Sequence, residues 1–320
     1  MPRADVDTAT GPVAADELGF VLPHEHLVWA EAGWQVDPVP RPAREDVVAS
    51  AVAVLERAAA SGVAAMVDPT PPEMGRDVDL MTEASRRTGV RVVFGTGLYC
   101  RWPTPYFAHR TAGELAEFFC TELTEGVGAE RARPAFVKLA IESGDFTAHE
   151  AAALEAAASA HRDLDVPLLV HCQPGAAIPV LRRLVGELGV DGGAVVVGHA
   201  EMEGDLAVHR EIVEGFGAFV GVDRCGTTAF GLDDDRRIGL VTALCALGHA
   251  GRVHLAHDTA TMPYGRGGPM LAGRLAEMPE WRVDHVGTRF LPRLRAAGVG
   301  EDDVRRMTVE APARWLSRWD

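Results

Sequence analysis

The sequence has almost no lysine. Lys138 stands alone beside 30 arginines, inside the apolar run Ala-Phe-Val-Lys-Leu-Ala-Ile over residues 135–141. A general bias towards arginine explains part of this shortage, but it does not explain why one lysine remains. Arginine stays protonated, whereas a buried lysine can lose its proton and act as a nucleophilic amine. The single lysine therefore indicates a position that needs an amine and not merely a positive charge.

Cysteine and basic charge are also scarce, and each shortage excludes a class of protein. The five cysteines, at positions 100, 120, 172, 225 and 245, form no Cys-x-x-Cys pair, which argues against a disulfide framework and favours a reducing cytoplasm. No apolar run approaches the roughly 18 residues of a membrane span, and the first residues contain no apolar signal region. The formal charge is −15, so nucleic acid and anionic membranes are excluded as partners, because both need clustered positive charge.

Short apolar segments rich in β-branched residues alternate with longer amphipathic segments. This alternation predicts a parallel sheet with right-handed crossovers, and eight units fit a closed (β/α)8 TIM barrel better than an open doubly wound sheet. Neither a Gly-x-Gly-x-x-Gly motif after the first strand nor a P-loop supports nucleotide binding. We expect residues 1–320 to form one barrel domain with a short N-terminal extension and C-terminal helices. The expected strands are 19–22, 64–67, 91–95, 135–139, 167–170, 194–197, 218–222 and 252–256. The expected helices are 43–60, 77–88, 111–123, 148–164, 178–188, 206–214 and 234–247, and, after an irregular stretch at 259–280, segments near 284–297 and 301–316.

Residues of the types that bind metal ions stand at the ends of these strands. His24 and His26 are two positions apart, so they point to the same side of an extended strand and can chelate one ion. His171, His199 and Asp258 end the fifth, sixth and eighth strands. A single buried histidine after a valine run is more often structural. Several strands that each bring a ligand type to one barrel mouth are harder to explain in that way, because barrel enzymes place their sites there.

Lys138 lies on the fourth strand, and strand parity places it on the same face as Phe136 and Ala140. If this face is turned to the barrel axis, burial disfavours the ammonium form of the lysine. One interpretation is an ion pair with a buried carboxylate. The other is that the neutral amine takes up carbon dioxide and becomes a carbamate, an anionic ligand that can bridge two metal ions. Arginine cannot do this, which would account for the solitary lysine.

A series of short motifs, in matching order and spacing, covers nearly the whole chain. They are Thr-Gly-Pro-Val, Leu-Gly-Phe and His-Glu-His-Leu (10–27), Val-Asp-Pro-Thr (67–70), Gly-Arg-Asp-Val (75–78), Gly-Thr-Gly-Leu-Tyr (95–99), Phe-Val-Lys-Leu-Ala (136–140), His171, Gly-His (198–199), Gly-Val-Asp-Arg (221–224), His-Asp (257–258), and Phe-Leu-Pro-Arg-Leu with a later Gly-Val (290–299). In these motifs the sequence resembles the phosphotriesterase family of the amidohydrolase superfamily, in particular its lactonase branch.

The resemblance implies a (β/α)8 barrel with two divalent metal ions, usually zinc, with manganese, cobalt or iron as alternatives. By position, His24, His26 and Asp258 hold the more buried ion, and His171 and His199 hold the more exposed one. Lys138, carboxylated on its side-chain nitrogen, bridges the two ions together with a hydroxide. Asp258 accepts and shuttles the proton, and Tyr99 and Arg224 contact the substrate.

We therefore expect a cytoplasmic hydrolase in which the bridging hydroxide attacks a lactone or a carboxylic ester, with promiscuous phosphotriesterase activity. The partner is a small-molecule substrate, and relatives are often homodimers. Three alternatives stay open. The same centre could serve an amidase or deacylase of an N-acyl compound, or an enzyme that uses the metals as Lewis acids without net hydrolysis. The chain could also be a barrel that binds a ligand without turning it over.

Some features depart from the well-known members of the family. The loop at 259–269 is rich in glycine and carries Tyr264 and Arg266, which argues against long-chain acyl lactones as substrates. Arg224 and Arg266 together would suit a substrate with a carboxylate or phosphate group, although solvated arginines explain them equally well. Cys225 is a candidate for the pocket lining. The remaining histidines are expected to be mostly solvated, with His257 close to a metal ligand.

Overall fold

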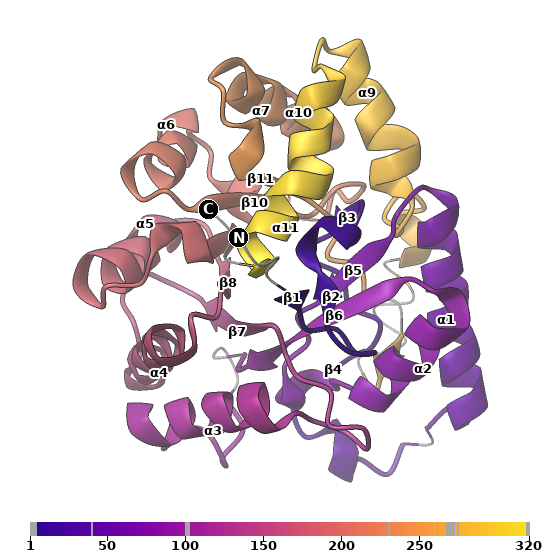
Figure 1. The fold of residues 1–320 in the computed structure, drawn as a ribbon, viewed down its shortest axis with the longest axis vertical. Coiled ribbons are helices and arrows are strands. Elements are labelled where there is room, and N and C mark those ends of the chain that lie inside the picture. Colours follow the sequence, from indigo (N-terminus) through magenta and orange to yellow (C-terminus); the bar gives the residue numbers. More distant parts are fainter. Residues whose placement is uncertain are drawn as a thin grey trace.

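A computed structural model describes residues 5–39, 41–99, 103–229, 231–260, 262–266, 273 and 275–317. At its centre is an eight-stranded sheet in which every named pair of neighbours is parallel and strand order follows chain order. Each expected strand is present within a few residues, so the predicted (β/α)8 barrel is confirmed (Figure 1). The strands are β3 (Val21–Leu22), β5 (Ala65–Asp68), β6 (Arg91–Gly97), β7 (Phe136–Ile141), β8 (Leu168–Cys172), β9 (Val195–Gly198), β10 (Phe219–Val222) and β11 (Val253–Leu255).

Helices surround the sheet on its outer side (Figure 1). Two of them begin with a capping box, in which Thr111 with Glu114, and Thr147 with Glu150, satisfy the first backbone N–H groups. Several predicted helices combine a short α-helix with a π-helical turn, as at 177–187 and 206–215. The helices are α1 (Arg44–Ala60), α2 (Val78–Thr88), α3 (Ala112–Glu125), α4 (Ala148–Leu164), α5 (Ala177–Leu181), α6 (Leu206–Arg210), α7 (Asp234–Ala246), α9 (Leu291–Ala296), α10 (Glu301–Arg305) and α11 (Ala311–Ser317).

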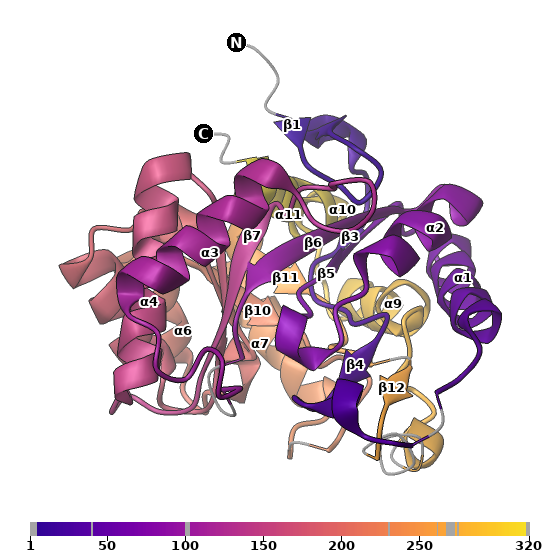
Figure 2. The ribbon, with the colours of Figure 1, turned by 90° about the horizontal axis from the view of Figure 1, so that it is seen from below.

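The barrel has a seam between its last and first strands. In the described part of the chain β11 and β3 do not pair, and the backbone closes the ring just beyond them. The Asp258 N–H donates to the His24 carbonyl at 3.0 Å, and the His26 N–H donates to the Thr259 carbonyl at 2.8 Å. Further out, β4 (Trp29–Ala30) pairs with β12 (Pro263–Tyr264) at the end of the molecule opposite β1 (Asp5–Val6) (Figure 2). The seam therefore joins the first and last loops of the barrel mouth.

Two apolar clusters divide the strand side chains by parity. Phe136 packs in one cluster with Phe219 and with Trp315 of α11, whereas Val137 and Leu139 belong to the other, which includes the helix faces. Trp315 donates from Nε1 to the Ala194 carbonyl at 3.1 Å, so α11 closes the amino-terminal end of the barrel. Because Lys138 shares the face of Phe136, it points to the barrel axis, as the sequence predicts.

The prediction that the remaining histidines are mostly solvated is wrong. His161, for example, bonds through Nδ1 to the Val166 carbonyl, and His209 bonds through Nε2 to the Ala200 carbonyl. Each of these two rings has a hydrogen-bond partner inside the protein, which is why its burial is tolerated. The buried ones are His161, His209, His254, His257 and His285.

Among the described residues, no helix has the length and apolar character needed to cross a membrane. Part of the irregular stretch expected at 259–280, and Cys100, lie outside the described residues.

Candidate metal centre

The structure brings all six predicted ligand residues together at the carboxyl ends of the strands. Two follow β3, two lie in neighbouring strands β7 and β8, and two follow β9 and β11: these are His24, His26, Lys138, His171, His199 and Asp258. The barrel mouth is thus built from residues up to 234 positions apart in sequence, which only closure of the ring makes neighbours.

Asp258 lies at the middle of this cluster. Its Oδ1 is 3.2 Å from His26 Nε2 and 3.6 Å from His24 Nε2, and its Oδ2 is 3.8 Å from His199 Nε2. Lys138 Nζ lies 3.2 Å from His24 Nε2. Imidazole nitrogens and a carboxylate oxygen that converge on one point form a donor set that divalent zinc accepts. The residues present therefore fit a metal ion held by His24, His26 and Asp258.

A second group of nitrogen donors stands beside the first. His171 Nδ1 is only 2.7 Å from His199 Nε2, and the two rings meet edge to face. The His199 ring in turn stacks on His24 with 5.1 Å between centroids. Two ring nitrogens directed at each other, next to the Lys138 amine, fit a second cation with nitrogen ligands.

Asp223 orients two of these rings from behind. Its carboxylate bonds His24 Nδ1 at 2.7 Å and His199 Nδ1 at 2.6 Å, and it also accepts the His199 backbone N–H at 3.0 Å. A ring that donates from Nδ1 keeps its Nε2 lone pair free for a metal ion. Asp223 also has oxygens of a type that binds metal near His24 and His199. Because these oxygens bond the Nδ1 atoms, we infer that Asp223 orients the two rings and does not bind the ion. The sequence analysis missed this role, and the signal was an acid at the end of the apolar strand 219–222.

Thr70 supports the third ring in the same way. His26 Nδ1 lies 2.7 Å from Thr70 Oγ1, which donates to Asp68 Oδ1, and Asp68 Oδ2 accepts the Leu27 N–H at 2.9 Å. Asp68 and Thr70 belong to the Val-Asp-Pro-Thr motif, whose role the sequence alone did not reveal. All three histidines near Asp258 are therefore held by hydrogen bonds on the side away from the cluster.

Burial sets the protonation of the cluster. It lowers the pKa of Lys138 to about 8 and that of His199 to about 4, and it holds the pKa of His171 well below its usual value. For Asp258 burial acts in the opposite direction, but the neighbouring His24 and His199 outweigh it, and the pKa stays well below its usual value. Neutral imidazoles and a carboxylate are the forms that metal binding requires.

The residues predicted to contact the substrate flank the cluster. Arg224 Nε is 3.4 Å from Asp258 Oδ2, and the Tyr99 ring meets the His171 ring edge to face with 5.6 Å between centroids. Both side chains therefore lie beside candidate metal ligands. The buried carboxylate of Glu73 accepts the Tyr99 N–H at 2.9 Å and the Thr104 N–H at 3.0 Å, so it anchors the loop that carries Tyr99.

Other candidates from the sequence lie away from the cluster. Arg266 is exposed and pairs with Asp37 at 2.9 Å. Cys225 is fully buried in the apolar cluster of the outer layer, so the expectation that it lines the pocket is wrong. Cys172 packs in that same cluster, on the opposite side of its strand from His171.

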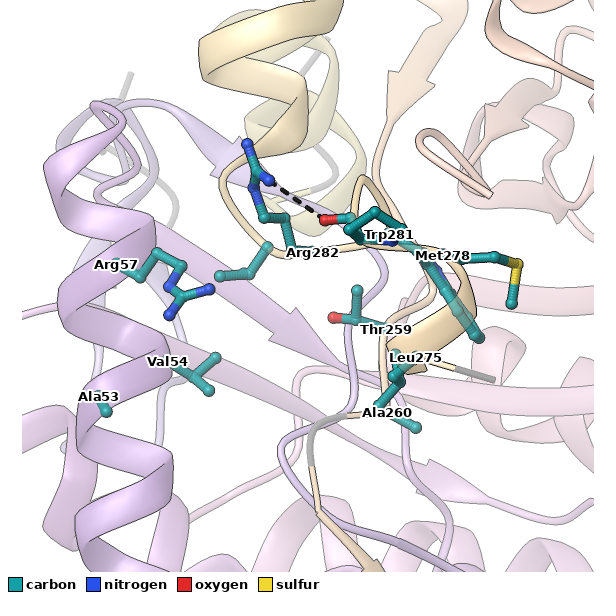
Figure 3. Close-up of a pocket in the computed structure, with 11 residues that line it drawn as sticks. Ala53, Val54, Arg57, Thr259, Ala260, Leu275, Met278, Trp281 and Arg282 are labelled. Carbon is teal, nitrogen blue, oxygen red and sulfur yellow. Dashed lines mark hydrogen bonds between the residues drawn. The ribbon is translucent and has the colours of Figure 1, made fainter. Parts of the chain in front are cut away.

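A cavity of about 320 Å³ lies behind the seam, between α1 and residues 278–283 (Figure 3). Thr259, next to Asp258 in the chain, lines it together with Trp281, while Arg57 and Arg282 stand at its side. The cavity therefore adjoins the backbone that carries one of the candidate ligands.

Comparison with known proteins agrees with this geometry. The family model described as the phosphotriesterase family matches residues 4–316. An aryldialkylphosphatase of Saccharolobus solfataricus is 30% identical over 309 residues, which cover 95% of this chain and 97% of that protein. An N-acetyltaurine hydrolase of Rattus norvegicus is 25% identical, with 98% and 97% of the two chains covered.

A solved structure is also similar. It is described as molecular engineering of organophosphate hydrolysis activity from a weak promiscuous lactonase template. It superimposes with a TM-score of 0.91 at 31% identity and covers 98% of this chain and 99% of its own. Family model, relatives and structure all match over nearly the full length. The chain belongs to the phosphotriesterase family, a family of metal-dependent hydrolases.

Proposed function

We propose that the protein is a binuclear metal-dependent hydrolase that opens a lactone or cleaves a carboxylic ester, with weak activity towards phosphotriesters. The observation that carries this proposal is the convergence of Asp258 with the Nε2 atoms of three histidines, beside the single lysine of the chain. One ion would be held by His24, His26 and Asp258, and the other by His171 and His199. When bound, two divalent ions supply a nucleophile from water near neutral pH and polarise the oxygen of the electrophile.

Lys138 is the bridging ligand in this proposal. Lys138 is 2% exposed, and burial lowers the pKa of its amine to about 8, so a neutral amine is available near physiological pH. A neutral amine can add to carbon dioxide and release a proton, which gives a carbamate, and this anionic group would help to hold the two ions. The donor set thereby gains an anionic oxygen ligand at a position where no carboxylate side chain is present.

The chain's other residues handle the proton and the substrate. Asp258 retains 17% side-chain exposure, so its carboxylate can take up a proton from the reaction and release it to solvent. The guanidinium of Arg224, 3.4 Å from Asp258, would attract a carbonyl oxygen or a carboxylate of the substrate. Tyr99, against the His171 ring, would orient the substrate beside that candidate ligand.

An amidase or deacylase of an N-acyl compound is the second candidate. The full-length similarity to an N-acetyltaurine hydrolase favours it, because that relative is named for cleavage of an N-acyl bond. The similarity of a structure derived from a lactonase template, at higher identity, favours the first candidate.

A substrate panel on zinc-loaded protein distinguishes the two. The panel holds γ- and δ-lactones, aryl esters, N-acyl amino acids and a phosphotriester, and kcat/KM is measured for each. We expect the highest value for a lactone and a much lower one for the phosphotriester, and Asp258→Asn, as the control, should lose both. Faster turnover of an N-acyl amino acid than of any lactone or ester would establish the second candidate. Absence of turnover across the panel would reject the proposed hydrolase.

A further inference from the structure

The carboxylate of Glu25 lies between two candidate metal ligands in sequence but points away from them. Because side chains alternate along an extended strand, His24 and His26 face the barrel mouth and Glu25 faces the outer layer. The side chains on either side of Asp258, those of His257 and Thr259, are directed towards Glu25. Glu25 is 1% exposed and His257 is completely buried, so these side chains meet inside the protein.

Glu25 receives four hydrogen bonds from the two neighbours of Asp258. One oxygen, Oε1, accepts the His257 backbone N–H at 2.8 Å and the His257 ring Nδ1–H at 2.5 Å. The other, Oε2, accepts the Thr259 backbone N–H at 3.1 Å and the Thr259 hydroxyl at 2.6 Å. The carboxylate thus holds the chain by hydrogen bonds immediately before and immediately after Asp258.

These hydrogen bonds flank a residue with an unusual backbone conformation. Asp258 has a φ of 53°, in the left-handed region that residues other than glycine rarely adopt. Such a conformation persists where the surroundings over-determine it. His199, the other candidate ligand with a positive φ, at 60°, is held comparably, because its N–H donates to the buried carboxylate of Asp223. Each left-handed ligand residue therefore has a buried carboxylate that bonds backbone N–H groups beside its side chain.

His257, which donates to Glu25, is itself held by further hydrogen bonds. His257 Nε2 accepts the Val286 N–H at 2.8 Å, and the His257 carbonyl accepts Trp281 Nε1–H at 2.6 Å. Because Nε2 accepts, Nδ1 carries the ring proton that Glu25 receives. Thr259 and Trp281 also line the cavity behind the seam (Figure 3). The position of Asp258 is therefore fixed to the first strand by Glu25 and to the segment before α9 by His257.

We propose that Glu25 is a positioning residue for the metal centre. Its carboxylate adds to the backbone hydrogen bonds that close the β11–β3 seam and fixes the position of Asp258 relative to the His24–His26 pair. The inference rests on the proposed function, since it requires that these three residues bind a metal ion. The hydrogen bonds that both neighbours of Asp258 donate to Glu25 hold the Asp258 carboxylate where it would share an ion with the two histidines.

The test is Co²⁺ binding to metal-depleted protein, followed by the visible absorption of the bound ion and by competition with a chelator. Glu25→Gln keeps the volume of the side chain but turns an amide N–H towards donors that need an acceptor. We expect a 10- to 100-fold loss of Co²⁺ affinity, the range known for partners of metal ligands, and a changed absorption spectrum. Thr259→Val, which removes one hydroxyl and keeps the backbone, should shift affinity in the same direction by less.

Glu150→Gln is the matched control. Glu150 is 3% exposed and likewise accepts two backbone N–H groups and a threonine hydroxyl, from Glu142 and Thr147 near α4. It should lower the melting temperature while leaving Co²⁺ affinity and spectrum as in the wild type. Wild-type affinity in both Glu25→Gln and Thr259→Val, or equal losses in Glu150→Gln, would overturn the positioning role. A wild-type protein that binds no Co²⁺ would instead overturn the metal centre, and the inference with it.

Discussion

At the scale of single residues, the chemistry of the site depends on groups whose protonation is set by burial. Lys138 is the clearest case. Its amine stands 3.2 Å from His24 Nε2, and burial lowers its pKa to about 8. Every other basic side chain apart from histidine is arginine. This contrast is explained if arginine serves wherever a positive charge suffices, and lysine remains where an amine must react.

Replacement of this lysine tests that explanation. Lys138→Arg puts a permanently charged, planar group among the candidate ligands and cannot form a carbamate. We expect metal content and lactone hydrolysis to fall to background, as measured by elemental analysis and kcat/KM. In Lys138→Ala, which leaves space in place of a charge, short carboxylic acids added with metal should restore part of the activity. A Lys138→Arg variant with wild-type activity would refute the carbamate.

At the scale of strands and helices, the sequence predicted much of what positions the site. Alternating apolar segments predicted eight strands, and parity correctly turned Lys138 towards the axis. Parity also implies that Glu25 faces outward, but not which residue it meets. Its partners lie 232 and 234 positions later. The contact of His24 with Asp223, 199 positions later, could not be predicted for the same reason. Such contacts follow from ring closure, which no local pattern encodes.

The connection between α2 and α3 offers a test at this scale. Arg76, just before α2, makes a two-point ion pair with Glu122 of α3 at 2.6 and 2.7 Å and also donates to the Gly95 carbonyl. The Arg76 side chain is 5% exposed and that of Glu122 is 14% exposed. Removal of one partner from such a buried pair leaves an uncompensated charge, so Arg76→Ala should lower the free energy of unfolding by about 3–5 kcal/mol.

Urea denaturation measures this change, and a surface pair provides the control. Arg210 and Glu214 form a two-point pair of similar length on half-exposed side chains four positions apart. Arg210→Ala should lower the free energy of unfolding far less than Arg76→Ala, because water already solvates both groups. An equal decrease in the free energy of unfolding in the two variants would show that burial does not determine how much the Arg76–Glu122 pair stabilises the protein.

At the scale of the whole molecule, the barrel is closed differently at its two ends. At the amino-terminal end, α11 inserts Trp315 against Phe136 and seals the interior with apolar contacts. At the carboxyl end the seam is polar, because the backbone bonds of His26 and Asp258 and the Glu25 carboxylate join the first and last strands. Apolar packing thus stabilises the amino-terminal end of the barrel. Polar groups join the strands at the carboxyl end, where the ligands of the proposed centre converge.

The most direct test of the account is the metal content of the purified protein, measured together with lactone hydrolysis before and after chelation. We predict about two divalent ions per chain, full loss of activity when a chelator removes them, and recovery when zinc is returned. Protein that keeps its full activity after its metal has been removed would contradict the account.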